Sequence, residues 1–321
     1  MVYIKVRNGL GNQMFVYAFG DYIESHFPEQ EIKYDFSELP HNIAGRKTYE
    51  VNSIFCHSFS SASNDEIRKC CGKPFYIGRI DNEVSIKNRV VRKINNITRF
   101  PRNVEVIKEP VPWDIPRSFV EKMLNIQLEK DRSYYFDGYW EDANYIAGRR
   151  DQLRALFEFN QIELSGELLE ILRNNETVSV HIRHGDYVTE SKQRKLPKNF
   201  FDVCADEYYE EAFQLIKNKV ENPFYIFFSD DPDYVEKKYR DVKNKYIVIG
   251  NRDYQDLYAM TLCKHSIVAN STFSFWGAFL KEQQGCVIAP KIHYIRCTEE
   301  GKYCKEFFNI HGWEYIDNSE V

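Results

Sequence analysis

The sequence predicts an α/β protein with parallel sheets. Its second half alternates strand and helix patterns as a βαβαβ series, the pattern of a parallel sheet with crossover helices. Its start combines a strand over residues 2–7, a glycine-containing turn and a helix from Met14, which is the opening of a Rossmann-like unit. Phe224–Phe228 is a continuous apolar run of the length expected for a strand buried on both faces.

Length and charge limit the classes of function. A chain of 321 residues suits two domains of ordinary size. The net charge of −5 and the pI near 6.0 argue against nucleic acid as a partner of the whole chain. Aromatic residues make up 15% of the chain, which suits either sugar stacking or ordinary core packing.

The cysteines and the N-terminal segment bear on the cellular compartment of the protein. Eight cysteines show no CxxC pair and no zinc spacing, so we expect reduced thiols and no metal site. The chain opens directly on a strand, without an apolar signal region or a membrane-length apolar run, and a cytoplasmic protein is therefore expected. The most basic window, residues 87–93, is compatible with contact at the inner face of an anionic membrane or with a lipid-linked substrate.

The stretch Thr177–Tyr187 is the strongest candidate for a functional site. It begins as an alternating β-branched run and ends in polar and charged residues that a strand would not choose for packing, namely His181, Arg183, His184, Gly185 and Asp186. In open α/β sheets, ligands bind in a crevice at the carboxyl ends of the strands, where polar and charged residues of this kind follow a buried strand. A local Arg183–Asp186 ion pair in a turn would explain the same residues without a ligand.

Three further stretches carry polar or aromatic groups of the same kind. The turn Asn8–Gln13 contains two glycines, which let the backbone approach a ligand, although a turn without a ligand would look the same. Asp230 and Asp231 follow the apolar run. Residues 269–280 place hydroxyl and amide groups at a strand-to-helix junction, namely Asn270, Ser271, Thr272 and Ser274. Together with the free N–H groups of the helix start they would form a neutral phosphate site. A simple N-cap explains one of these four residues. Tyr139 and Trp140 can stack on a sugar or belong to a core.

These stretches together give the chain a family resemblance. It resembles the bacterial branch of the α-1,2-fucosyltransferases, glycosyltransferase family 11. The matching segments, in chain order, are Gly9-Leu-Gly-Asn-Gln-Met-Phe15, His181-Ile-Arg-His-Gly-Asp-Tyr187 and Asn270-Ser-Thr-Phe-Ser-Phe-Trp-Gly-Ala-Phe-Leu280, with related segments at Gly138-Tyr-Trp and Phe228-Ser-Asp-Asp. One departure is His184, which stands where the family motif has a second arginine.

The resemblance implies a fold and an activity. It implies a GT-B fold of two facing Rossmann-like domains with parallel sheets. Residues 1–175 would lie on the acceptor side, and residues 176–321 would bind GDP-fucose, with the tail packing back on the N-terminal domain. The implied reaction transfers L-fucose from GDP-β-L-fucose, with inversion and without metal or another cofactor, to the 2-hydroxyl of a galactose-terminated glycan. That acceptor is either free or lipid-linked, as in surface polysaccharide synthesis.

The chemistry of this transfer suggests roles for the candidate residues. Arg183 can bind phosphate oxygens in pairs and stays charged, so it suits the leaving diphosphate. Neutral donors would come from Gly11, Asn12 and Gln13 and from the junction hydroxyls. A carboxylate can accept from guanine N1 and N2, which makes His181 with Asp230 or Asp231 the candidates for the base of GDP. Tyr139 and Trp140 are the acceptor candidates.

The general base and the function class both have alternatives. Asp186 is the first candidate for the base, and His184 or an acidic residue elsewhere is the alternative. A GT-B transferase with another donor or linkage would share the Arg183 strand. A non-catalytic sugar- or nucleotide-binding protein would keep the aromatic residues and lack turnover.

Overall fold

The computed structural model describes residues 1–37, 39, 51–63, 65–67, 104–110, 115–185, 204–283, 285–298 and 301–318. The chain divides into two compact units, Met1–Arg149 with Ala155–Glu158, and Arg150–Arg154 with Phe159–Val321. The basic window 87–93 and Asp186 lie outside the described residues. In the part of the chain that is described, no helix has the length and apolar character needed to cross a membrane.

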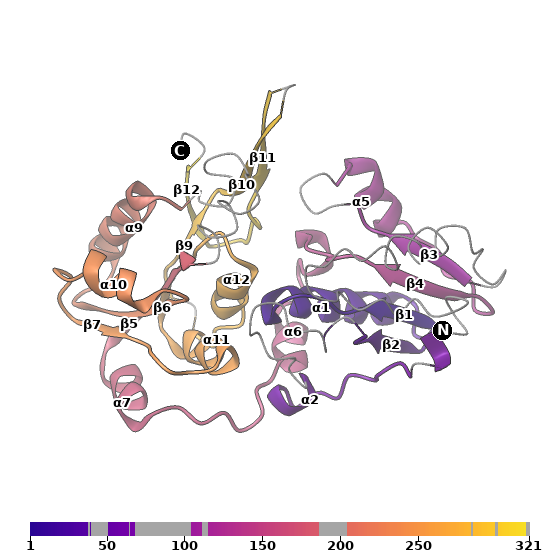
Figure 1. Ribbon diagram of the computed structural model, residues 1–321, viewed down its shortest axis with the longest axis horizontal. Coiled ribbons are helices and arrows are strands. Elements are labelled where there is room, and N and C mark those ends of the chain that lie inside the picture. The colour runs from indigo at the N-terminus through magenta and orange to yellow at the C-terminus, as the bar shows by residue number, and fades with distance from the viewer. Residues whose placement is uncertain are drawn as a thin grey trace, which may run out of the picture. The chain divides into compact units, whose positions relative to one another are not determined.

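The first unit contains a parallel sheet whose described strands have the order β2-β1-β4-β3 (Figure 1). The strands are β1 (Val2–Lys5), β2 (Ile32–Asp35), β3 (Val104–Lys108) and β4 (Ser133–Asp137). The helical elements are α1 (Leu10–His26), α2 (Val51–Ile54), α5 (Arg117–Leu124) and the 3₁₀ turn η1 (Ala143–Tyr145). The chain moves from β1 to β2 on one side and later returns through β3 to β4 on the other. The topological switch point therefore lies between β1 and β4.

Helix α1 begins earlier than the sequence predicted. Gly9 is its N-cap residue, so the glycine-containing segment through Gln13 forms the first helical turn and not a connection before Met14. Most of the helix is buried, including Met14. At Gly20 a Cβ atom would stand 2.1 Å from the Tyr34 hydroxyl oxygen, so only glycine allows this close approach between helix and sheet.

The second unit contains a larger parallel sheet, whose described strands have the order β12-β9-β8-β5-β6-β7 (Figure 1). The strands are β5 (Glu176–Ile182), β6 (Pro223–Ser229), β7 (Lys245–Ile247), β8 (His265–Ile267), β9 (Val287–Pro290) and β12 (Glu314–Ile316). A separate antiparallel hairpin is formed by β10 (Ile292–Thr298) and β11 (Gly301–Glu306). The helices are α6 (Arg150–Leu156), α7 (Gly166–Asn174), α9 (Asp206–Lys219), α10 (Pro232–Lys238), α11 (Asp253–Leu262) and α12 (Thr272–Phe279).

Both faces of this second sheet are covered, as its apolar runs predict. On β6, Tyr225 and Phe227 belong to a core cluster with residues of α9, whereas Ile226 and Phe228 belong to another with residues of α7 and α11. The α/β class and the two parallel-sheet, Rossmann-like units are therefore confirmed. Each sheet has its own carboxyl edge, where polar residues follow the strands.

The predicted domain boundary needs correction. The expected boundary at residues 175/176 would assign α7 to the first unit, but α7 belongs to the second. The reason is that Leu168 and Leu172 share a core cluster with Ile226 and Phe228 of β6. In the tail, strand β12 pairs in parallel with β9 at the edge of the second sheet. Packing of the tail on the N-terminal domain stays a prediction.

Candidate active site

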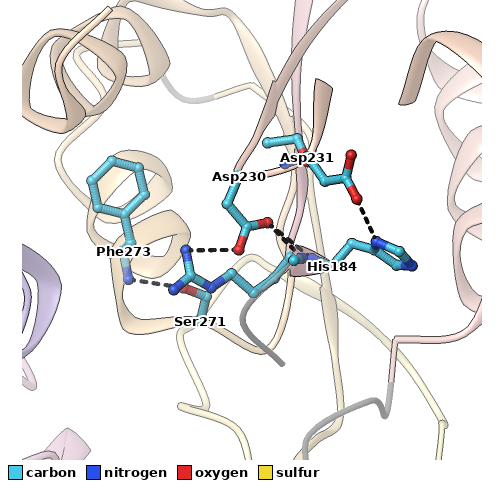
Figure 2. A network of polar contacts seen from close by, with 8 residues as sticks. His184, Asp230, Asp231, Ser271 and Phe273 are labelled. Carbon is cyan, nitrogen blue, oxygen red and sulfur yellow. Dashed lines mark hydrogen bonds and ion pairs between the residues drawn. The ribbon is translucent and has the colours of Figure 1, made fainter. Parts of the chain in front are cut away.

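The carboxyl edge of the second sheet brings together Arg183 and Asp230. β5 and β6 run in parallel with Ile182 opposite Ser229, so the residues that follow the two strands meet. Arg183 Nη1 lies 3.5 Å from Asp230 Oδ2, and both side chains are about one-fifth exposed, at 19% and 23%. Figure 2 shows Asp230 in the same view as Ser271 and Phe273 at the start of α12. A fixed cation therefore stands at the sheet edge.

Asp230 also organises the backbone that leaves β5. Its Oδ1 accepts hydrogen bonds from the N–H groups of His184 and Gly185, at 3.0 and 3.2 Å. At Gly185 a Cβ atom would lie 3.4 Å from the Asp230 carboxylate, an ordinary contact, so glycine is not required there for space. Both Asp230 oxygens are thus engaged with this strand end.

Asp231 is likewise occupied within the protein. Its Oδ1 accepts from the N–H of Tyr234 at 3.1 Å and caps α10, and its Oδ2 lies 2.9 Å from His184 Nδ1 (Figure 2). The His184 ring also stacks on Tyr234, with 3.8 Å between centroids and 7° between the planes. Both carboxylates thus have partners within the protein, and the prediction that Asp230 or Asp231 binds guanine stays a prediction. His184 is held firmly in one orientation.

His181 is buried near this cluster and electrically neutral. Its side chain is 4% exposed, and among the described residues Nδ1 has no hydrogen-bonding partner. Burial lowers the pKa of His181 to about 3, and the nearby Arg183 charge adds to the decrease, while Asp230 opposes it. Phe273 lies beside the ring, with 5.7 Å between centroids. The prediction that His181 binds the donor stays a prediction, and its Nδ1 is a buried atom for which the described residues supply no partner.

The polar residues at the β8–α12 junction mainly serve the protein itself. All four are buried, with 2% to 9% exposure. Asn270 Nδ2 donates to the carbonyl of His293 at 2.8 Å, and Ser274 Oγ is 3.3 Å from the carbonyls of Ala269 and Ser271. Ser271 Oγ accepts from the Phe273 N–H and is the N-cap of α12. Side-chain groups of Asn270, Ser271 and Ser274 are therefore engaged within the protein, and binding of phosphate at this junction stays a prediction.

The candidates in the first unit divide into surface and core residues. In the first turn of α1, Gly11 is buried and Asn12 is half-buried. Gln13 is 2% exposed and its Nε2 donates to the Asn8 carbonyl at 2.8 Å. Tyr139 is half-buried. Trp140 is fully buried and stacks on Phe19 at 4.2 Å, so its predicted stacking on an acceptor sugar is wrong. Its ring fills the core of the unit instead.

Sequence reasoning missed a carboxyl group with an unusual environment. Burial raises the pKa of Asp256, in the first turn of α11, to about 7, and the neighbouring Asn251 amide offsets this only in part. Asp256 lies one helical turn before Met260, which packs in the same cluster as Phe228. Nothing in the local sequence distinguishes Asp256 from an ordinary acidic residue near a helix start, because its burial is tertiary.

Comparison with known proteins identifies the family of the chain. The family model described as Glycosyl transferase family 11 matches residues 1–317. The chain is 29% identical to the Alpha-1,2-colitosyltransferase of Escherichia coli over 90% of this chain and 91% of that one. It is 28% identical to the O-antigen biosynthesis glycosyltransferase WbnK of E. coli over 90% and 94%. A Mus musculus protein, Galactoside 2-alpha-L-fucosyltransferase Sec1, is 30% identical over 32% of this chain and 28% of its own length. Because the family model spans nearly the whole chain, this protein belongs to glycosyl transferase family 11.

Proposed function

We propose that this glycosyltransferase transfers L-fucose from GDP-β-L-fucose to the 2-hydroxyl of a galactoside, with inversion and without a metal. The observation that carries the proposal is Arg183, a fixed cation at the carboxyl edge of the second sheet, beside the buried neutral ring of His181. The name of the mouse relative, a galactoside 2-α-L-fucosyltransferase, supports the choice of donor and acceptor.

Arg183 would stabilise the leaving diphosphate. As the bond between fucose C1 and the β-phosphate oxygen breaks, negative charge develops on GDP and requires a preorganised cation. A guanidinium has five N–H donors in a planar fork, so pairing with Asp230 through Nη1 is compatible with phosphate contacts through its other donors. Asp230 would then orient the fork and the outgoing backbone.

The acceptor hydroxyl must lose its proton as its oxygen attacks C1 from the face opposite the diphosphate. The geometry favours His184 for this task. With the proton on Nδ1 donated to Asp231, Nε2 carries the lone pair that accepts the acceptor proton. Stacking on Tyr234 fixes the ring plane. Asp186 is the other candidate for the base.

The base assignment can be tested with two substitutions. His184→Gln keeps a hydrogen-bonding side chain but removes the imidazole base, whereas Asp186→Asn removes the other candidate. If His184 is the base, the first variant loses turnover by about 10²–10⁴-fold with unchanged GDP affinity, and the second retains most activity. The reverse pattern assigns the role to Asp186.

A second donor has specific support. Colitose is L-fucose without the 3-hydroxyl, and the E. coli colitosyltransferase aligns over nine-tenths of this chain. The same attack at C1 and the same diphosphate contacts would serve either sugar. Competition between GDP-fucose and GDP-colitose, with both products quantified by mass spectrometry, decides between them through the ratio of kcat/KM values.

The primary experiment measures GDP release from GDP-fucose in EDTA with lactose as acceptor, for the natural protein, Arg183→Ala and Arg173→Ala. Arg173 is an exposed arginine of α7 and is the matched control. Lactose-dependent GDP release that is lost only in Arg183→Ala supports the proposal. GDP binding without release of fucose from either donor would indicate a nucleotide-binding protein instead. Activity that requires added metal would contradict the metal-independent mechanism.

A further inference from the structure

The switch point of the first sheet carries a polar cluster that the proposed chemistry does not use. Arg7 and Asn8 follow β1, and Asp137 and Tyr139 lie at and beyond the end of β4. The Arg7 guanidinium donates to Asp137 and lies 5.3 Å from the centroid of the Tyr139 ring. Asn8 Nδ2 donates to the Tyr139 hydroxyl at 2.9 Å. We call these four residues the Arg7 cluster.

The backbone around the Arg7 cluster is held in an uncommon conformation. Asn8 and Trp140 have φ angles of 61° and 57°, in the left-handed region. Asparagine tolerates this region, but a bulky residue such as tryptophan adopts it only where the surroundings enforce it. The enforcing group is Glu109, whose Oε2 accepts from the N–H groups of Tyr139 and Trp140, the latter at 2.9 Å. Such strain at a switch point between parallel strands is typical of a binding site.

The charge of the Arg7 cluster argues against a phosphate ligand. Arg7 and Asp137 neutralise each other, and the Glu109 carboxylate behind Tyr139 adds a negative charge. The formal charges of Arg7, Asp137 and Glu109 sum to −1, so these three described side chains offer a phosphate no net positive charge. The cluster instead offers guanidinium and amide donors close to carboxylate and phenol acceptors. Sugar hydroxyls both donate and accept hydrogen bonds, so this mixture matches a neutral polyhydroxylated ligand.

From these observations we infer that the Arg7 cluster binds the hydroxyls of the neutral galactoside acceptor, with Asn8 and Tyr139 in contact with the sugar. Glu109 is a positioning residue, since it acts through the backbone of Tyr139. The inference rests on the proposed function and adds Arg7, Asn8 and Asp137 to the residues that select the acceptor. These residues also take the place of Trp140 as acceptor candidates, because the Trp140 ring is buried in the core.

The test uses two variants of the full chain that remove one contact each. Tyr139→Phe keeps the ring and removes the hydroxyl, and Asn8→Gly removes the amide while favouring the left-handed backbone. Asn222→Gly, at a left-handed position in the second unit (φ 51°), is the matched control. Lactose binding to the GDP-loaded protein is titrated by saturation-transfer NMR, and lactose KM is measured where turnover occurs.

We expect each of the two cluster variants to weaken lactose binding by about tenfold, the effect of one lost hydrogen bond, with unchanged GDP affinity and no change in Asn222→Gly. Unchanged lactose affinity in both variants would overturn the inference, as would failure of the natural protein to bind lactose. Displacement of lactose by millimolar sulfate would assign the cluster to an anion and also overturn it. Failure of the proposed function shows separately, as absence of GDP binding or of transfer.

Discussion

The carboxyl edges of the two sheets can be compared directly, because each places an arginine beyond one strand and an aspartate at or beyond the end of its neighbour. In the second unit Asp230 pairs with Arg183 and also accepts two backbone N–H groups. In the first unit Asp137 pairs with Arg7, and a different residue, Glu109, accepts the backbone N–H groups of the adjoining loop. In the second unit one residue thus both pairs with the arginine and accepts the backbone N–H groups, whereas in the first unit two residues divide these roles.

This difference indicates that strand order determines where on the sheet a binding site forms, whereas the neighbouring residues determine which ligand it suits. Near Arg183 lies a buried neutral imidazole, His181, whose ring lies beside Phe273 of α12, and we propose a nucleoside diphosphate there. Beside Arg7 lie a phenol and an amide, which suit a sugar. Four predictions follow the contrast from the largest expected effect to the smallest.

Replacement of the second unit's arginine should have the largest effect. Arg183→Lys keeps the charge but loses the planar fork, so kcat/KM for fucosyl transfer should fall by about 10²–10³-fold. The control Arg173→Lys, on the exposed side of α7, should remain at the natural value. Steady-state GDP release measures both. Equal activity of Arg183→Lys and the natural protein would contradict the proposed role of the Arg183 guanidinium in stabilising the diphosphate.

A substitution at Gly138 should strain the first unit alone. A Cβ atom there would lie 2.5 Å from Glu109 Cβ and 2.9 Å from the Trp140 ring, so Gly138→Ala should cost about 1–3 kcal/mol. Gly166→Ala, where a Cβ meets nothing within 4 Å, should cost nothing measurable or stabilise slightly. Hydrogen exchange should quicken in peptides of β4 and stay unchanged in β5. Exchange that quickens equally in both sheets would show that the strain is not local.

Two buried groups of the second unit should give stability opposite dependences on pH. The folded pKa of His181 is lowered to about 3, so the unfolded state binds more protons between pH 3 and about 6.5, and stability falls as the pH decreases through that window. The folded pKa of Asp256 is raised to about 7, so the folded state binds more protons between about pH 3.9 and 7, and stability falls as the pH increases. Each slope approaches about 1.4 kcal/mol per pH unit and the two largely cancel near pH 5.

Single variants should expose these two slopes. With His181→Gln, the free energy of unfolding should decrease from pH 5 to pH 7, because only the Asp256 contribution remains. With Asp256→Asn it should increase over the same interval. Urea unfolding at pH 5, 6 and 7 provides the measurement, and exposed His311→Gln is the control. Slopes of the same sign in both variants would contradict the burial of one of the two groups.

The smallest effect separates two serine N-caps. Ser271 caps α12 at the candidate site and Ser165 caps α7 away from it, each by accepting a backbone N–H. Either serine replaced by alanine should cost about 1 kcal/mol of stability. If the α12 N-terminus also holds the diphosphate, Ser271→Ala should in addition weaken GDP binding in calorimetric titration, whereas Ser165→Ala should not. Equal GDP affinity in both variants would leave Ser271 as a cap only.

Local pattern was enough to locate several elements. Val287–Pro290 is the strand β9 as predicted, and the apolar run Phe224–Phe228 forms most of β6. The polar residues after β5 and β6 were expected at strand ends, and the parallel register brings Arg183 and Asp230 together. These predictions succeeded because apolar runs of strand length between turn residues have few other solutions in an α/β chain.

Other elements depend on partners that are distant in the chain. The strand β3 pairs with β4, and β12 pairs with β9. The hairpin β10–β11 lies between β9 and β12 in the sequence. Neither β3, β12 nor the hairpin was predicted. These short edge or hairpin strands lack a continuous apolar run, so their pattern is weak. Their formation follows from an open hydrogen-bonding edge that another segment provides.

For this protein, then, the sequence alone determined the α/β class, the parallel sheets and the residues that stand at the strand ends. The tertiary structure decided what those residues do. It buried Trp140 against Phe19, turned Gln13 toward Asn8, and used both carboxylates of Asp230 and Asp231 inside the protein. The physical reason is that hydropathy acts through local periodicity, whereas burial, hydrogen-bond satisfaction and pKa depend on neighbours that the fold brings from elsewhere in the chain.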